Sequence, residues 1–175
     1  MRRILVDDAK CLACHACELA CAVAHSESKT LFGAIAEQSL PISGMYVEPG
    51  VKGRGFPLNC RHCQDPQCVR ACVTKALHSD PNGAVVFDKN RCLGCQMCFI
   101  ACPFGAIAEA SSDSCFISKC DLCSGSENAF CQSQKPACVC ACPTRALVFE
   151  DADDFSKSKR RKYLVELAVS SDQAV

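Results

Sequence analysis

One cysteine-rich stretch constrains this chain more than any other. The segment from Arg91 to Ile107 reads R-C-L-G-C-Q-M-C-F-I-A-C-P-F-G-A-I. Its cysteines are Cys92, Cys95, Cys98 and Cys102. Two-residue spacers let a tight turn wrap three thiolates around one face of a cubane iron-sulfur cluster. The fourth cysteine is expected to open a short helix and to ligate a neighbouring cluster, and Pro103 suits the next position because it needs no N–H. The stretch therefore predicts [4Fe-4S] clusters in pairs.

The pattern recurs along the chain, so the sequence contains an internal repeat. The first motif, C-L-A-C-H-A-C-E-L-A-C, aligns with the central one at every cysteine, and also at Leu12/Leu93 and Ala20/Ala101. Another copy, with a longer middle spacer, begins at Cys60, and a fourth begins with K-C-D-L-C. The fourth ends in V-C-A-C-P-T-R-A-L, which echoes V-R-A-C-V-T-K-A-L at the end of the second. The outer cysteines of these three motifs are Cys11, Cys14, Cys17, Cys21, Cys60, Cys63, Cys68, Cys72, Cys120, Cys123, Cys138 and Cys142.

Nineteen cysteines, about 11% of the residues, leave two classes open, a secreted disulfide scaffold and an intracellular metal protein. The opening residues reach Asp7 and Asp8 without the apolar run of a secretory signal, and we expect no membrane span. A reducing cytoplasm is therefore expected, where such cysteines are metal ligands. Close-set triplets disfavour zinc, and the odd count disfavours disulfides. The formal net charge of +0 and the absence of a basic tract do not indicate a nucleic-acid partner.

Because each fourth cysteine serves a neighbouring cluster, the motifs must work in pairs. The shared endings suggest that the first motif pairs with the fourth and the second with the third. This predicts four cysteine sets, each holding one [4Fe-4S] cluster. Set A is Cys11, Cys14, Cys17 and Cys142; set B is Cys21, Cys120, Cys123 and Cys138; set C is Cys60, Cys63, Cys68 and Cys102; set D is Cys72, Cys92, Cys95 and Cys98.

The predicted fold class is α+β, with two modules of short strands and helices around the clusters and the second module inserted in the first. Residues 1–175 would form a single four-cluster iron-sulfur domain. Module one covers about 1–30 and 113–150, module two about 55–110, and an insert and a tail cover 31–54 and 151–175. A short strand is expected in 1–10, and a helix is expected to run past Cys21 to about 28–33. Further strands are expected at S-G-M-Y-V-E and A-V-V-F-D, a solvated hairpin tip around Lys52 and Arg54, a serine-rich linker after Ile107 and a helical or frayed tail.

Three cysteines remain outside the four sets: Cys115, Cys131 and Cys140. Cys140 lies between two assigned ligands, so its side chain should point away from their cluster. The alternative that Cys131 replaces Cys138 stays open. His15 and His62 lie inside cluster loops, where an imidazole could tune a cluster potential or could simply face solvent. No phosphate loop, dinucleotide fingerprint or nucleophile with an identifiable base is present, so no catalytic residue is assigned.

With all four motifs in view, the span from Cys11 to about Glu150 resembles the four-cluster ferredoxin-like electron-transfer subunits. These accompany molybdenum or tungsten oxidoreductases, formate hydrogenlyase and carbon monoxide dehydrogenase. C-E-L-A-C-A-V-A-H-S-E-S-K at Cys17 to Lys29 and G-R-G-F-P-L-N-C-R-H-C at Gly53 to Cys63 look most like the carbon monoxide dehydrogenase iron-sulfur protein. The chain departs from the pattern in lacking prolines after Cys21 and Cys72.

The resemblance implies a non-catalytic subunit that relays electrons between a catalytic oxidoreductase and a second redox partner. Carbon monoxide dehydrogenase is the expected catalytic partner, with a hydrogenase or flavoprotein downstream. The alternative is a subunit of a tungsten or molybdenum aldehyde oxidoreductase or of a formate dehydrogenase. An enzyme with one labile cluster ligand and a purely structural subunit are the competing classes. The expected location is the cytoplasm or the periphery of a membrane complex.

Overall fold

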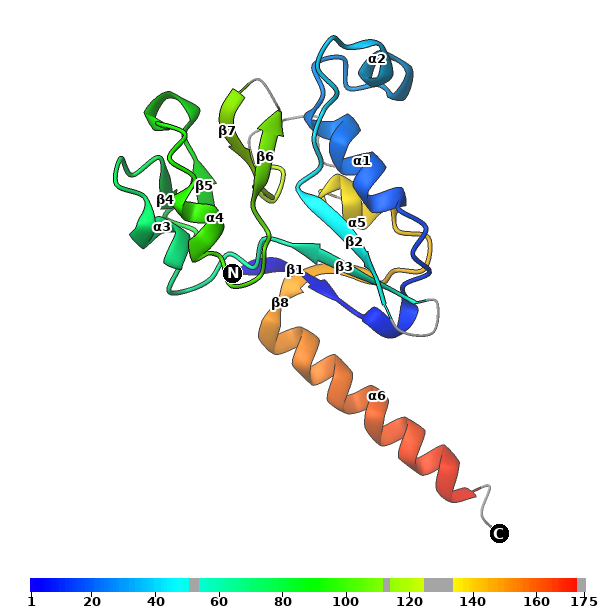
Figure 1. Cartoon of the computed structure of the whole chain (residues 1–175). Coiled ribbons are helices and arrows are strands. Elements are labelled where there is room, and N and C mark those ends of the chain that lie inside the picture. Colours follow the sequence, from blue (N-terminus) through cyan, green and yellow to red (C-terminus); the bar gives the residue numbers. More distant parts are fainter. Residues whose placement is uncertain (51–53, 112–113, 125–133, 173–175) are drawn as a thin grey trace.

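The computed structural model describes residues 1–50, 54–111, 114–124 and 134–172, and its elements are short (Figure 1). In chain order they are β1 (Arg2–Val6), α1 (Ala16–His25), α2 (Leu31–Ala36), β2 (Met45–Pro49), β3 (Gly55–Asn59), α3 (Gln67–Ala71), β4 (Leu77–Ser79), β5 (Val85–Phe87), α4 (Met97–Ala101), β6 (Ala108–Ser111), β7 (Ser114–Ser118), α5 (Ala137–Ala141), β8 (Leu147–Asp151) and α6 (Ala152–Asp172). Short helices and strands joined by loops confirm the α+β class.

The first predicted strand pairs with a strand from the far end of the chain. β1 is antiparallel to β8, with Arg2 opposite Asp151 and Val6 opposite Leu147. The Asp7 N–H extends the ladder by donating to the Ala146 carbonyl at 2.7 Å. This sheet joins the segment before the first motif to the segment after the fourth.

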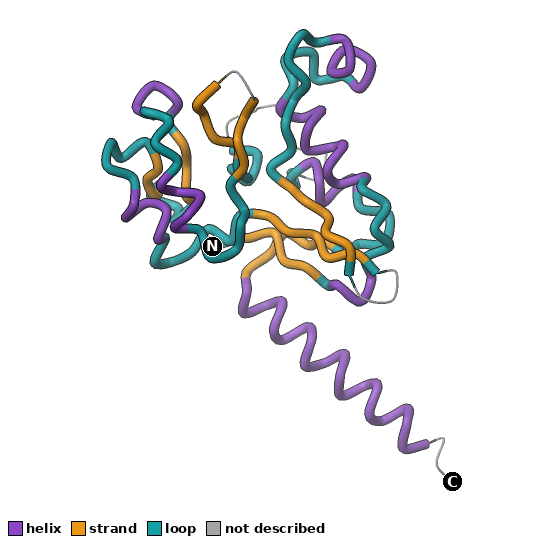
Figure 2. The backbone as a smooth tube through the Cα atoms, in the orientation of Figure 1, coloured by secondary structure: helices purple, strands orange, loops and turns teal. Residues whose placement is uncertain are grey.

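The motif helices pack in two pairs. α1 contacts α5, and α3 contacts α4, so the first motif lies against the fourth and the second against the third (Figure 2). Two hydrophobic cores follow this grouping. The first core contains Ile4, Cys21, Cys120 and Leu147 among others, and the second contains Leu77, Val85, Cys98, Ile107 and Ile117. Much of each core is cysteine, which is expected where the chain is built around metal ligands.

The segment between the first two motifs contributes to the first core. Its hairpin of β2 and β3 buries Met45 and Val47, and each such burial stabilises the fold by about 1.5–3 kcal/mol. The Val47 N–H donates to the Glu18 carboxylate of α1. The predicted strand is thus confirmed, and Arg54 is exposed as expected for a hairpin tip, while Lys52 lies outside the described residues.

Three local predictions are wrong. α1 does run past Cys21, but it ends at His25, because the Ser26 hydroxyl donates to the Val23 carbonyl and accepts from the Lys29 N–H. A further helix, α2, follows, with the Thr30 hydroxyl accepting from the Gly33 N–H as its N-cap. The segment after Ile107 is a hairpin of β6 and β7 rather than a linker, with residues 112–113 outside the described part.

The fourth cysteine of three motifs ends a helix and does not open one. Cys72, Cys102 and Cys142 are the C-caps of α3, α4 and α5. Pro103 and Pro143 therefore stand just beyond a helix end, where proline is common because it cannot continue the helix. Cys21, which no proline follows, lies inside α1 instead.

The tail is a helix of 21 residues that leaves the body after β8 (Figure 1). The expected helix is therefore confirmed, and its docking on a partner stays a prediction. Its start is held by Lys159, whose Nζ lies 2.6 Å from the buried Asp7 carboxylate. Beyond that point Tyr163, Leu164 and Val165 are exposed. No helix in the described part of the chain is long and apolar enough to cross a membrane.

Candidate metal centres

All four motifs begin with the same backbone feature. The second residue after the first cysteine has a positive φ in each case, namely Ala13, His62, Gly94 and Leu122. A non-glycine residue in this region is uncommon and costs free energy, so it persists where the surroundings require it. Alternation with ordinary conformations turns successive N–H groups toward one point, which forms an anion-binding concavity. The four loops are therefore built to face a negatively charged group such as a thiolate-ligated cluster.

The region after the fourth cysteine also repeats. Three residues beyond Cys72, Cys102 and Cys142 the backbone again has a positive φ, at Lys75, Gly105 and Arg145. The chain thereby turns back over the cysteine before entering the next strand. The Leu77 N–H lies 3.4 Å from Cys72 Sγ, and the Ala146 N–H lies 3.2 Å from Cys142 Sγ.

Three of the four sets each surround a cavity. Set A lines one together with Leu12 and Pro143, and set D lines another together with Leu93 and Thr74. Set C lines a third, of about 260 Å³, together with Pro66 and Phe104. In each case a cysteine from one motif joins three cysteines of another, which is the crossed arrangement expected from paired motifs.

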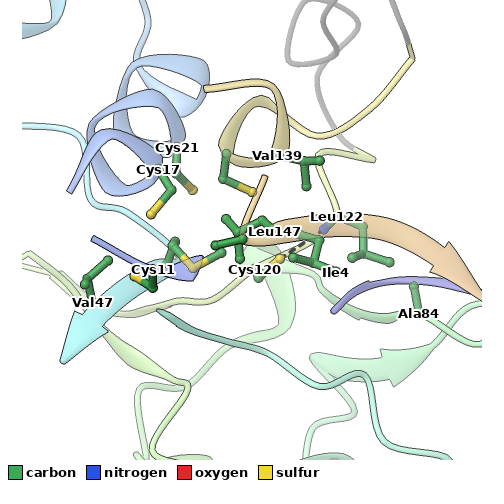
Figure 3. Packing of buried hydrophobic residues seen from close by; sticks show 13 residues of the cluster. Ile4, Cys11, Cys17, Cys21, Val47, Ala84, Cys120, Leu122, Val139 and Leu147 are labelled. Atoms are coloured by element: carbon green, nitrogen blue, oxygen red, sulfur yellow. Dashed lines mark hydrogen bonds between the residues drawn. The ribbon is translucent and has the colours of Figure 1, made fainter. Parts of the chain in front are cut away.

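Set B forms the most enclosed group. Cys21, Cys120, Cys123 and Cys138 are all buried, and the structure brings α1, the last cysteine loop and α5 together around them. Figure 3 shows Cys17 and Cys21 on α1 facing the α5 residues, with Cys120 beneath them. Burial raises the pKa of Cys138 far above its ordinary value, and the neighbouring Cys120, Cys21 and Cys123 thiols raise it further. Four thiols this close together can all ionise only if a cation holds them.

The sulfurs accept hydrogen bonds from the backbone. The Gly94 N–H lies 3.4 Å from Cys92 Sγ, and the Gly44 N–H lies 3.3 Å from Cys21 Sγ. Burial tends to raise the pKa of Cys72, but the N–H of Leu77 and the hydroxyl of Thr74 outweigh it, and the pKa is lowered. The same holds for Cys142, with burial opposed first by the N–H of Leu147 and then by the hydroxyl of Thr144. Such donors favour the thiolate, which is the form that binds iron.

One orphaned polar atom also fits a bound cluster. The Tyr46 hydroxyl is buried and has no hydrogen-bond partner among the described residues. Burial, assisted by the charges of Cys21, Glu18 and Cys120, raises the pKa of Tyr46 to about 12, so the ring lies beside set B. A buried hydroxyl without a partner is costly, and cluster sulfur would accept its hydrogen bond. The donor set and the surroundings of set B therefore suit an iron-sulfur cluster.

The cysteines outside the sets lie elsewhere. Cys140 is on α5 and is disulfide-bonded, so the expectation of no disulfide is wrong at this residue. The sixteen cysteines of the four sets are free thiols. Cys115 lies in β7, and Cys131 lies outside the described residues, so the alternative ligand for set B stays open.

The two loop histidines have different surroundings. His15 is exposed and pairs with Glu18 at 2.7 Å, as a solvent-facing histidine would. His62 is only 1% exposed, and its Nδ1 accepts from the Val85 N–H at 3.0 Å, so the solvent-facing interpretation is wrong for it. Burial lowers the pKa of His62 to about 4, and the Lys119 and Arg3 charges act in the same direction.

Sequence reasoning missed two polar residues beside set B. His25 contacts Asp121 and Cys21, and Lys119 donates to the Cys120 carbonyl. Both signals were present in the sequence, since His25 follows Cys21 by one helical turn and Lys119 directly precedes Cys120.

The comparisons with known proteins agree with this geometry. A model of the 4Fe-4S dicluster domain matches residues 51–152. The chain is 39% identical to an iron-sulfur protein of Rhodospirillum rubrum, across 91% of this chain and 87% of that protein. It is 34% identical to the electron transport protein HydN of Escherichia coli K12, across 92% and 96%. It is also 33% identical to the B subunit of the anaerobic dimethyl sulfoxide reductase of the same strain, across 87% and 74%. The protein therefore belongs to the family of 4Fe-4S ferredoxin-like electron-transfer subunits that carry the dicluster domain.

Proposed function

We propose that sets A, B, C and D each hold one [4Fe-4S] cluster and that the protein relays electrons along them in that order. The observation that carries the proposal is the meeting of cysteines from distant motifs, such as Cys142 with the first motif around one cavity. The same meeting supports two modules, with the second inserted in the first. When bound, each cluster supplies a one-electron couple, and full cysteine ligation leaves no open iron position for a substrate.

The order of the sets follows from contacts between them. Sets A and B share the first core through Cys17 and Cys138. Cys60 of set C packs against the same core and lies close enough to Cys120 of set B for its charge to raise the pKa of that thiol. Set D follows set C because α3 contacts α4. The four sets thus form a line with B and C in the middle.

The two ends of this line reach the surface. Cys14 of set A and Cys95 of set D are exposed, whereas all four cysteines of set B are buried. Beside them Leu12 is 67% exposed and Leu93 is 76% exposed, at equivalent positions of the repeat. Exposed leucines next to a redox centre suit contact with a partner that brings its own cofactor close. The protein's residues therefore exclude water from the middle of the line and leave both ends accessible.

For the partners, we propose carbon monoxide dehydrogenase as the electron donor and a hydrogenase or flavoprotein as the acceptor, in the cytoplasm. The two segments at Cys17 to Lys29 and Gly53 to Cys63 support the donor, and so does the similarity to the iron-sulfur protein of Rhodospirillum rubrum. The relative named for dimethyl sulfoxide reductase keeps a molybdenum or tungsten enzyme as the alternative.

Purification of the native complex tests the partners. The protein is tagged in its own host, purified without oxygen, and its largest co-purifying subunit is identified by mass spectrometry. A carbon monoxide dehydrogenase supports the proposal, and a molybdenum or tungsten enzyme supports the alternative. Recovery of the chain with a non-redox protein alone would contradict both.

A further inference from the structure

Lys119 joins the two halves of the molecule through its side chain. The residue follows β7 directly and precedes Cys120. Its Nζ donates to the Cys120 carbonyl at 2.7 Å and to the Val85 carbonyl at 2.5 Å. Val85 is 1% exposed and Cys120 is 8% exposed, so both acceptors belong to buried residues. One ammonium group thus satisfies two carbonyls at the centre of the protein.

The two carbonyls belong to different cores. Val85 packs in the second core with Leu77 and Ile117, while Cys120 packs in the first core with Ile4 and Leu147. Lys119 therefore lies on the boundary between the motif pairs, with Ile117 two residues before it in one core and Cys120 after it in the other. A hydrogen-bonded ammonium at this boundary fixes the distance between them.

The charge of Lys119 acts on cysteines of both middle sets. Cys60 and Cys68 belong to set C and Cys120 to set B, and Lys119 opposes the effect of burial on the pKa of all three. The other polar groups nearby differ in kind. His62 is buried, and Asp121 is paired with His25. Lys119 is therefore the cation that sets B and C share.

We propose that Lys119 is a positioning residue for electron transfer between sets B and C, which it holds at a fixed separation while its positive charge favours the reduced form of both clusters. The inference rests on the proposed function, since it requires clusters in both sets. In the step concerned, one electron leaves the reduced cluster of one set and arrives at the oxidised cluster of the other. No bond or proton is involved. A cation beside both clusters raises both potentials together and keeps the step nearly level.

The test is a redox titration of the reconstituted full chain, followed by electron paramagnetic resonance without oxygen. Lys119→Met removes the charge and both hydrogen bonds, Lys119→Gln removes the charge but keeps a donor, and Lys119→Arg keeps the charge. Lys157→Met is the matched control, because it removes an exposed α6 lysine far from the cysteine sets. We expect Lys119→Met and Lys119→Gln to shift two of the four potentials downward and to leave the other two unchanged. Lys119→Arg should restore those two potentials toward wild type, and Lys157→Met should match wild type.

Two results would overturn the inference. Potentials of Lys119→Gln that coincide with wild type at all four clusters would show that the charge does not act on the clusters. An equal shift of all four would show a global change instead of a local one. If Lys119→Met loads less iron, Lys119→Gln and Lys119→Arg still decide the question. A wild-type protein that lacks four reducible clusters contradicts the proposed function itself, so the two failures are distinguishable.

Discussion

His25 Nε2 lies 3.1 Å from the Asp121 carboxylate, so the last residue of α1 is joined to a residue between two set B cysteines. The other ring nitrogen, Nδ1, donates to the Cys21 carbonyl at 2.8 Å and lies 3.8 Å from Cys21 Sγ. Asp121 also accepts from the Cys123 N–H at 2.8 Å. The pair thus ties together the chain segments that carry three of the four set B cysteines.

We expect His25→Gln to lower the free energy of unfolding by about 1–2 kcal/mol, because it removes a charge-assisted hydrogen bond between half-buried groups. The hydrogen bond to Asp121 raises the pKa of His25 to about 11, and the pKa of Asp121 falls to about 2, with burial opposing and the hydrogen bond from His25 outweighing it. The contribution of Asp121 is therefore complete above its unfolded pKa near 4 and is lost as the pH falls toward 2. That of His25 is complete below its unfolded pKa near 6.5 and is lost as the pH rises toward 11.

Denaturation of wild type and His25→Gln across this pH range checks the prediction. His78→Gln is the control, because His78 is an exposed histidine on β4. A difference between wild type and His25→Gln that is the same at pH 2.5 and pH 7 would contradict the assigned pairing.

Two threonines provide a test of which cysteine serves which cluster. Thr74 Oγ1 lies 3.7 Å from Cys72 Sγ, and Thr144 Oγ1 lies 3.7 Å from Cys142 Sγ. Hydrogen bonds to cluster sulfurs raise the potential, so Thr74→Val should lower the potential of the set D cluster and Thr144→Val that of the set A cluster. Each variant is the control for the other in a redox titration. If both variants moved the same cluster, the division into sets A and D would be wrong.

The start of α6 depends on a buried carboxylate. The hydrogen bond from Lys159 lowers the pKa of Asp7, with burial opposing it and Lys10 assisting. Its stabilisation is therefore present above pH 4 and is lost as the pH falls below that value. We expect Asp7→Asn to cost about 1 kcal/mol, since Lys159 is 43% exposed and solvent screens the pair.

Amide hydrogen exchange of α6 at pH 7 measures this effect, and protection near the start of the helix should fall in Asp7→Asn. The control Asp154→Asn removes the exposed partner of Lys157 and should leave protection unchanged. Equal protection in wild type and Asp7→Asn would show that Lys159 does not anchor the helix.

Serine substitutions test the ligand assignment directly. Cys102→Ser should remove about four irons from the protein, because the set C cluster loses a ligand. Cys140→Ser should leave the iron content unchanged, since Cys140 is disulfide-bonded and belongs to no set. A comparison of Cys138→Ser with Cys131→Ser decides the open alternative for set B. Iron loss in Cys131→Ser alone would assign Cys131 to the cluster in place of Cys138.

The motif spacing predicted which cysteines meet because the geometry of a cluster loop is local in sequence. A cysteine spacing determines how a loop can surround a cluster, so sets A, C and D line the cavities expected for them. The strands at 2–6, 45–49 and 85–87 were also predictable from short apolar alternation. These features depend on residues that are close in the chain.

The surroundings of the sets depend on distant residues and could not be predicted in the same way. Nothing near His25 in sequence indicates Asp121, and nothing near Lys119 indicates Val85. β6 and β7 were missed because serine-rich strands of a small hairpin lack apolar alternation. The helix ending at Cys102 was assigned to the wrong side of the cysteine, since a spacing fixes which residues meet but not which flank is helical.

The iron and sulfide content of the fully reconstituted wild-type protein tests the central claim most directly. Four clusters in sets A to D predict about sixteen irons and about sixteen acid-labile sulfides per polypeptide, with no zinc. About eight irons per polypeptide, or zinc in place of iron, would contradict it.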